Sequence, residues 1–114
     1  MLRWSPDEFL AAWETLENYS VFKGQFQVGF FSLSEQAGDL YIRDLQLSPT
    51  CTGQGIGTWV LSEIASMATQ RNCQSIRLKV FADNPAISLY RRKGFDVVGH
   101  EPHLLRMELR IACR

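Results

Sequence analysis

"LQLSPTCTGQGIGTWVLSEIASMA", residues 45–68, carries the strongest structural signal in this chain of 114 residues. An alternating apolar stretch leads into three glycines at every second position, and apolar residues at helical spacing follow. We therefore expect a strand, a loop and then a helix over residues 55–71. The first N–H groups of a helix attract phosphate oxygens, and glycines let the backbone come close to them. The stretch predicts an anion-binding loop.

Several classes of protein use such a loop, and two of them can be tested on residue identity. A nucleotide-binding loop of the Walker type ends in Gly-Lys-Ser/Thr, whereas Gly57 is followed by Thr58 and Trp59. A dinucleotide-binding loop needs a third glycine where this chain has Val60. Both classes are excluded. A tight strand-to-helix turn, with glycines present only for steric reasons, stays open as an alternative.

The residues before this loop predict a helix and three strands. Ser5 as N-cap, Pro6 at the first helical position and Trp4 packed against Phe9 favour an amphipathic helix over 5–18. "YSVF", "FQVGFFSL" and "LYIRDLQL" then alternate as strands, separated by short glycine-containing turns. We expect these three strands to form an antiparallel meander.

The residues after the loop complete one domain over 1–114. "SIRLKVF", residues 75–81, follows the long helix as a strand, which predicts a right-handed β-α-β crossover. "NPAISLYRRKGF", residues 84–95, is a short helix with Asn84 as its cap and Gly94 at its end. "FDVVGH" and "LLRMELRI" predict two final strands.

Composition narrows the classes of partner. Twelve basic and twelve acidic residues give no net charge, so no nucleic-acid partner is expected. Three cysteines without ligand spacing predict neither a disulfide framework nor a metal site. Without a signal-like N-terminus or an apolar run long enough to span a bilayer, we expect a soluble, cytoplasmic protein with no membrane partner.

The glycine loop, "NPAISLYRRKGF" one helix and one strand later, and a last hairpin ending in "RMEL" together resemble the GCN5-related N-acetyltransferase (GNAT) family. The resemblance runs from about Val21 to the C-terminus. It implies an α/β (α+β) acyltransferase fold with a mixed, mostly antiparallel sheet and helices on both faces. It also implies a V-shaped opening between strands four and five.

The resemblance further implies acetyl-coenzyme A as co-substrate. The pyrophosphate would lie on the loop formed by Thr52, Gly53, Gln54, Gly55, Ile56, Gly57 and Thr58. The pantetheine arm would pair with the main chain of Leu45, Gln46 and Leu47. The family's loop usually opens with Arg or Gln where this chain has Thr52. A side-chain contact is therefore missing, which weakens the expected affinity but leaves the backbone contacts.

Two residues of the short helix receive roles from the resemblance. Asn84 would bind the pantetheine, and Tyr90 would protonate the departing thiolate, since a tyrosine pKa near ~10 is close to that of a thiol. From the residues alone, Asn84 also fits a simple helix cap and Tyr90 a core position. Arg91 and Arg92 fit either a ribose phosphate or the negative end of the helix dipole.

The acceptor is expected to be a primary amine that attacks the thioester directly. A base must remove its proton, and Asp44 is the first candidate. Further candidates are Glu14, Glu17, Glu101, His100 and His103. A covalent route through the Cys51 thiol lacks a paired histidine base.

The N-terminus departs from the family, whose members usually begin with an additional strand and helix. Only about twenty residues precede the meander here. Either the acceptor site is unusually open, or a second copy of the chain completes it as a homodimer. A non-catalytic acyl-coenzyme A binding or regulatory module is the alternative function.

Overall fold

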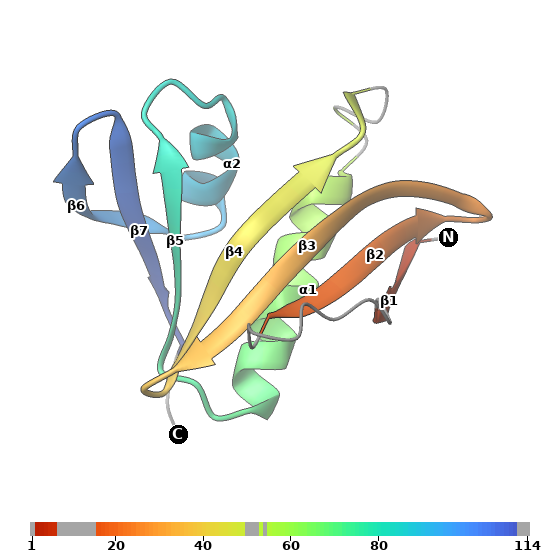
Figure 1. Ribbon diagram of the computed structural model, residues 1–114, viewed down its shortest axis with the longest axis horizontal. Coiled ribbons are helices and arrows are strands. Elements are labelled where there is room, and N and C mark those ends of the chain that lie inside the picture. The colour runs from red at the N-terminus through yellow and green to blue at the C-terminus, as the bar shows by residue number, and fades with distance from the viewer. Residues whose placement is uncertain (1, 7–15, 50–52, 54, 112–114) are drawn as a thin grey trace.

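The structure, a computed structural model, describes residues 2–6, 16–49, 53 and 55–111. These residues form one seven-stranded sheet and two helices (Figure 1). The strands are β1 (Leu2–Pro6), β2 (Glu17–Lys23), β3 (Phe26–Gln36), β4 (Asp39–Leu47), β5 (Ser75–Phe81), β6 (Asp96–Glu101) and β7 (Leu104–Arg110); the helices are α1 (Ile56–Gln70) and α2 (Ala86–Arg92).

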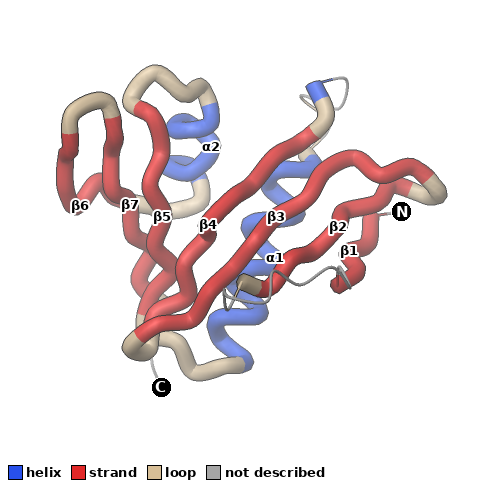
Figure 2. The backbone as a smooth tube through the Cα atoms, viewed as in Figure 1, coloured by secondary structure: helices blue, strands red, loops and turns tan. Residues whose placement is uncertain are grey.

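The sheet is mixed and mostly antiparallel, as the sequence predicts. Its order is β1-β2-β3-β4-β5-β7-β6, and only β4 and β5 run parallel (Figure 2). β2, β3 and β4 form the expected antiparallel meander. A parallel pair needs a crossover connection, and α1 supplies it between β4 and β5.

α1 packs on the sheet and α2 lies against α1, while the predicted N-terminal helix falls largely on residues 7–15, outside the described residues. α1 contacts β4 and β5. Lys93, after α2, donates a hydrogen bond from Nζ to Ser62 Oγ of α1 at 2.9 Å. The core between helices and sheet contains the fully buried side chains Phe31, Leu33, Leu40, Ile56, Ile64, Ile76, Met107, Val21 and Val60.

The predicted N-terminal helix over 5–18 is wrong at both ends. Leu2–Pro6 is a strand paired with β2, and β2 itself begins at Glu17. The Trp4 ring packs edge-on against Tyr19 with ring centroids 5.2 Å apart. Residues 7–15, among them Phe9, lie outside the described residues.

Tertiary pairing outweighs the local helix signal here. Proline is tolerated at the end of an edge strand, where its missing N–H costs no ladder bond. A strand therefore does precede the meander. The homodimer that would complete the acceptor site stays a prediction.

A β-bulge interrupts β4 in its middle. Ser32 of β3 pairs with Asp44, but the next β3 residue, Leu33, pairs with Ile42, so Arg43 is the extra residue on β4. The bulge shifts the inward-facing positions from even to odd numbers. Leu40 and Ile42 are buried, and beyond the bulge Leu45 and Leu47 take over that face while Asp44 and Gln46 are exposed.

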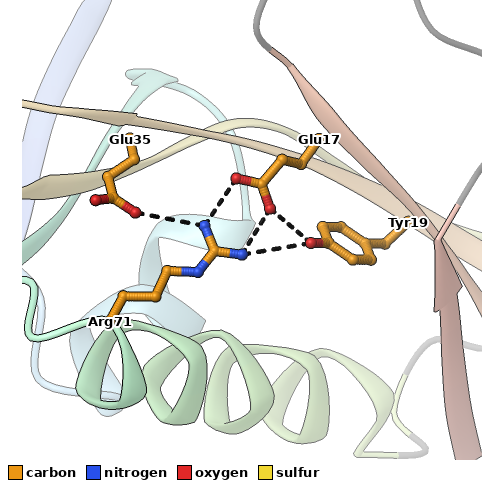
Figure 3. A network of polar contacts seen from close by, with 4 residues as sticks. All are labelled: Glu17, Tyr19, Glu35 and Arg71. Atoms are coloured by element: carbon orange, nitrogen blue, oxygen red, sulfur yellow. Dashed lines mark hydrogen bonds and ion pairs between the residues drawn. The ribbon is translucent and has the colours of Figure 1, made fainter.

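A polar network ties the C-terminal end of α1 to the meander (Figure 3). The Arg71 guanidinium donates hydrogen bonds of 2.7 and 2.6 Å to the two Glu17 oxygens, and it lies 3.6 Å from Glu35. The Tyr19 hydroxyl donates to Glu17 at 2.6 Å. The Arg71 hydrogen bonds lower the pKa of Glu17, while burial and the neighbouring Glu17 carboxylate raise that of Tyr19.

Candidate active site

β4 and β5 separate half-way along their length. They pair only over Asp39–Ile42 and Ser75–Leu78, whereas β4 continues to Leu47 and β5 to Phe81 (Figure 1). Over residues 43–47, the edge of β4 that faces β5 has no strand partner in the described part of the chain. Unpaired backbone groups on a strand edge can pair with an amide-bearing ligand. The expected opening between strands four and five is thus present.

A cavity of about 530 Å³ fills this opening. It brings together residues from β4, from β5 and from α2 with the loop before it. Its lining residues are Ile42, Arg43, Asp44, Leu45, Gln46, Leu47, Leu78, Lys79, Val80, Phe81, Asn84, Tyr90 and Leu104. Six residues that the sequence singles out, Asp44, Leu45, Gln46, Leu47, Asn84 and Tyr90, therefore share one cavity.

Two glycines of the loop before α1 have left-handed backbones. Gly53 and Gly55 have φ of +80° and +74°, a conformation that favours glycine. Gly55 is the N-cap, and no described side chain caps the helix. A Cβ added at either glycine would meet no atom of the described residues within 4 Å. Thr52 and Gln54 lie outside the described residues.

The first turn of α1 is held close to α2. A Cβ at Gly57 would lie 2.7 Å from Leu89 Cδ2 and 3.4 Å from Leu47 Cδ1. Ile56 and Gly57 are buried, whereas Thr58 is exposed. The N-terminus of α1, the end of β4 and α2 consequently converge at one end of the opening.

Tyr90 is 6% exposed and lies in the cavity wall, with its ring edge-on to Phe95. Burial raises the pKa of its phenol, and the negative charge of Asp44 raises it further. The phenol therefore keeps its proton at neutral pH and can donate it. The sequence left a core position and a site position open for Tyr90, and the structure shows that Tyr90 is buried and also lines the cavity.

Asn84 does cap α2, although the helix begins at Ala86 rather than at Pro85. Its Oδ1 accepts a hydrogen bond from the Ala86 N–H at 2.9 Å. This contact fixes the amide, so that its NH₂ group is left to donate. Arg91 and Arg92 are exposed in the last turn of α2.

The other candidate bases of the described residues are not among those that line this cavity. Glu17 is bound to Arg71 after the C-terminus of α1, about 20 Å along the helix from the glycine loop. Glu101 forms an ion pair with Lys79 at 3.2 Å. His100 is exposed on β6, and His103 has φ +67° in the turn before β7. Glu14 and Cys51 lie outside the described residues.

Arg43 and Lys79 are cationic residues that line the cavity and that the sequence did not single out. A signal for Arg43 exists in "LYIRDLQL": the apolar positions 40 and 42 are followed by 45 and 47. A strand alternates with a period of two, so this slip by one residue marks a bulge.

Neither metal nor membrane features stand out in the described residues. They contain no group of three or more His, Cys, Asp or Glu side chains placed to hold a metal ion. Neither α1 nor α2 is long and apolar enough to cross a membrane.

Comparison with known proteins identifies the family. Residues 2–95 match the Acetyltransferase (GNAT) family. The chain belongs to this family. The membership that the glycine loop and the "NPAISLYRRKGF" segment predict is thereby confirmed, and the match begins at β1, upstream of Val21.

Solved structures of GNAT proteins and other acetyltransferases share the fold. A PaiA N-acetyltransferase from Thermoplasma acidophilum, solved in complex with coenzyme A, superposes with a TM-score of 0.78 at 25% identity, covering 83% of this chain and 60% of that one. The ribosomal-protein-S18-alanine N-acetyltransferase from Escherichia coli gives a TM-score of 0.81 at 17% identity, covering 100% and 96%. The GNAT fold thus extends over this whole chain.

A sequence relative is the thialysine N-epsilon-acetyltransferase of Bos taurus, 34% identical over 67 residues. The aligned segment covers 57% of this chain and 39% of the bovine protein. The aligned segment therefore spans less than half the length of that curated relative.

Proposed function

We propose that this GNAT protein transfers the acetyl group of acetyl-coenzyme A to a primary amine. The observation that carries the proposal is the single cavity between β4 and β5, which holds Asp44, Asn84 and Tyr90 next to the glycine turn before α1. In the proposed reaction the glycine turn and Asn84 bind the co-substrate, while Asp44 and Tyr90 transfer protons. The coenzyme A complex of the Thermoplasma relative supports the choice of donor.

The residues present fit the co-substrate. The N–H groups that open α1 suit the pyrophosphate, because no described side chain caps the helix and a Cβ at Gly53 or Gly55 would meet no atom of the described residues within 4 Å. The unpaired β4 edge over 43–47 suits the amides of the pantetheine arm. The Asn84 NH₂ group can donate to a pantetheine carbonyl. Acetyl-coenzyme A supplies the activated acyl group as a thioester.

The reaction is a direct attack. The amine nitrogen forms a bond to the thioester carbonyl carbon, and the carbon–sulfur bond breaks. Tyr90 gives its phenolic proton to the leaving sulfur, which yields free coenzyme A. Asp44, which lines the same cavity, accepts the proton that the amine loses, directly or through water. The proton passed to Asp44 balances the one given by Tyr90.

Calorimetric titration with coenzyme A, followed by a thiol-release assay with acetyl-coenzyme A over a panel of primary amines, tests this function. We expect saturable binding and release of one thiol per acetylated amine. Binding without turnover on any amine would favour the alternative, a non-catalytic acyl-coenzyme A binding module. Absence of coenzyme A binding would overturn both.

A further inference from the structure

A second cavity, of about 490 Å³, lies beside the proposed active site. It is lined by Tyr41, Arg43, Arg77, Lys79, Val98 and Arg106, with Met107 and Glu108 below them. It shares Ile42, Arg43, Leu78 and Lys79 with the cavity that holds Tyr90. The two cavities therefore meet where the pairing of β4 and β5 ends, between Ile42 and Leu78.

Three cationic residues form a row across the sheet at this junction. Lys79 of β5 and Arg106 of β7 are direct cross-strand partners. Arg43 follows Ile42, whose partner Leu78 precedes Lys79, so it continues the row onto β4. All three side chains line the second cavity. Like charges directly opposite each other destabilise a sheet unless an opposite charge offsets them.

The neighbouring row of the same sheet is compensated. Arg77 lies 2.7 Å from its cross-strand partner Glu108 and 3.2 Å from Asp39. In the row of three, only Lys79 has an acidic partner, Glu101 at 3.2 Å. Arg43 and Arg106 form no ion pair with any carboxylate of the described residues. The positive charge at the junction is therefore not balanced from within the described chain.

Both arginines are held in place without an acidic partner. Arg43 is the bulged residue of β4; its Nε donates to Ser34 Oγ at 2.7 Å, and its guanidinium carbon lies 4.5 Å from the centre of the Tyr41 ring. These contacts turn the Arg43 guanidinium toward Ser34 of β3, from where its positive charge acts on the cavity.

Arg106 owes its position to a glycine. A Cβ at Gly99 would lie 2.5 Å from an Arg106 terminal nitrogen and 2.8 Å from its guanidinium carbon. Gly99 is not among the positive-φ glycines, so its backbone does not require glycine. The absent side chain instead leaves the space in which the Arg106 guanidinium lies.

From this arrangement we infer that the second cavity binds the acceptor, and that the acceptor carries an anionic group, a carboxylate or a phosphate, besides its amine. Arg106 binds the anionic group, while the amine reaches the thioester through the junction at Ile42 and Leu78. That the ligand of this cavity is an acceptor rests on the proposed acetyl transfer. That the cavity binds an anion rests only on the row of cationic residues.

A binding experiment tests the anion site without turnover. The unfolding temperature is measured with ε-aminocaproate against hexylamine, with γ-aminobutyrate against butylamine, and with phosphoethanolamine against ethanolamine, at equal ionic strength and with coenzyme A present. We expect at least one amine that carries a carboxylate or phosphate to stabilise the protein more than the partner that lacks this group; the carboxylate and phosphate pairs tell which anion is preferred. Arg106→Met should remove this difference. Arg110→Met, a matched change on the same strand at an 84% exposed side chain, should keep it.

Kinetics with the same pairs tests the acceptor. The ratio of kcat/KM between the preferred anionic amine and its partner should exceed about tenfold, the effect of about 1.4 kcal/mol. Arg106→Met should bring that ratio close to one, whereas Arg110→Met should not. An anion-specific shift without turnover on any amine would leave the anion site standing and remove the proposed acetyl transfer. Equal shifts within every pair, or equal turnover, would overturn the inference.

Discussion

Tyr90 of α2 and Asp44 of β4 line the same cavity, and the carboxylate acts on the phenol across it. Its negative charge adds to burial in raising the pKa of Tyr90 above the ordinary value of 10.0. The two residues are 46 positions apart in the chain, brought together by the parallel pairing of β4 with β5 and by α2 after it. The proposed reaction needs one proton donor and one proton acceptor, and these two residues can supply both within one cavity.

Replacing Tyr90 by Phe should lower kcat by about 100-fold or more, the usual contribution of a general acid. Binding of coenzyme A should change little, because the ring and its contact with Phe95 remain. Thiol-release kinetics and calorimetry measure the two quantities. An unchanged kcat would remove Tyr90 as the proton donor.

The pH profile gives an independent check on the same pair. Since the folded pKa of Tyr90 is raised, its deprotonation should halve the rate of the wild-type protein only above pH 10.0, the ordinary value. Asp44→Asn removes the nearby charge, so the alkaline fall of the rate that remains in this variant should move to lower pH. The same alkaline limb in both proteins would show that Asp44 does not act on Tyr90.

Replacing Gly55 by Asp should weaken coenzyme A binding far more than replacing it by Asn. The two side chains are nearly equal in size, and Asn tolerates the left-handed φ of +74°. Asp adds a negative charge where phosphate is expected, although a carboxylate at a helix N-terminus stabilises the helix itself. The Kd of the Asp variant should exceed that of the Asn variant by about tenfold or more, which equals about 1.4 kcal/mol. Equal Kd values would place the phosphates elsewhere.

Two substitutions of Asn84 separate its structural role from its binding role. Asn84→Ala removes the hydrogen bond to the Ala86 N–H and should lower the free energy of unfolding by about 1 kcal/mol. Asn84→Asp keeps an acceptor for that N–H, so stability should be retained, but it lacks the NH₂ donor. Both variants should bind coenzyme A more weakly than the wild type. Wild-type affinity in the Asp variant would make Asn84 a helix cap and nothing more.

The Glu17–Arg71 pair should make stability depend on pH in the acid range. The folded pKa of Glu17 lies below its ordinary value of 4.5, so its contribution is complete above pH 4.5 and is lost as the pH falls through the folded value. Both side chains are about one third exposed, so Glu17→Gln should cost only about 1 kcal/mol at neutral pH. Denaturant unfolding of the two proteins should show this difference at pH 7 and converge at low pH. Asp96→Asn, at an exposed carboxylate on β6, serves as the control, and a difference that persists in acid would contradict the assignment.

Elements whose signals are local are predicted well. α1 begins within one residue of the expected position because the left-handed glycine before it is a backbone requirement written in the sequence. α2 ends at Arg92, with Lys93 as its C-cap, because Gly94, with φ +98°, can take the conformation that terminates a helix. The glycine loop, the Asn84 cap and the buried Tyr90 of the candidate site belong to these two helices or adjoin them, so they were predicted together with the helices.

Elements whose partners are distant are predicted poorly. Ser5 and Pro6 match a helix start, yet they belong to a strand, because Leu2–Pro6 pairs with β2 some 17 residues away in sequence. Neither strand's sequence predicts how many residue pairs β4 and β5 form before they separate. That number depends on the bulge at Arg43, on α1 between the strands and on β7 across β5.

The sequence by itself determined the family, the glycine turn before α1 and the identity of the residues that converge on it, because these depend on backbone conformation and short-range spacing. Tertiary structure alone decided that Asp44 and Tyr90 line one cavity and that Arg43, Lys79 and Arg106 form one row at the opening. Cross-strand register places side chains beside each other irrespective of their distance along the chain, so charges that balance over 114 residues can still accumulate at one place.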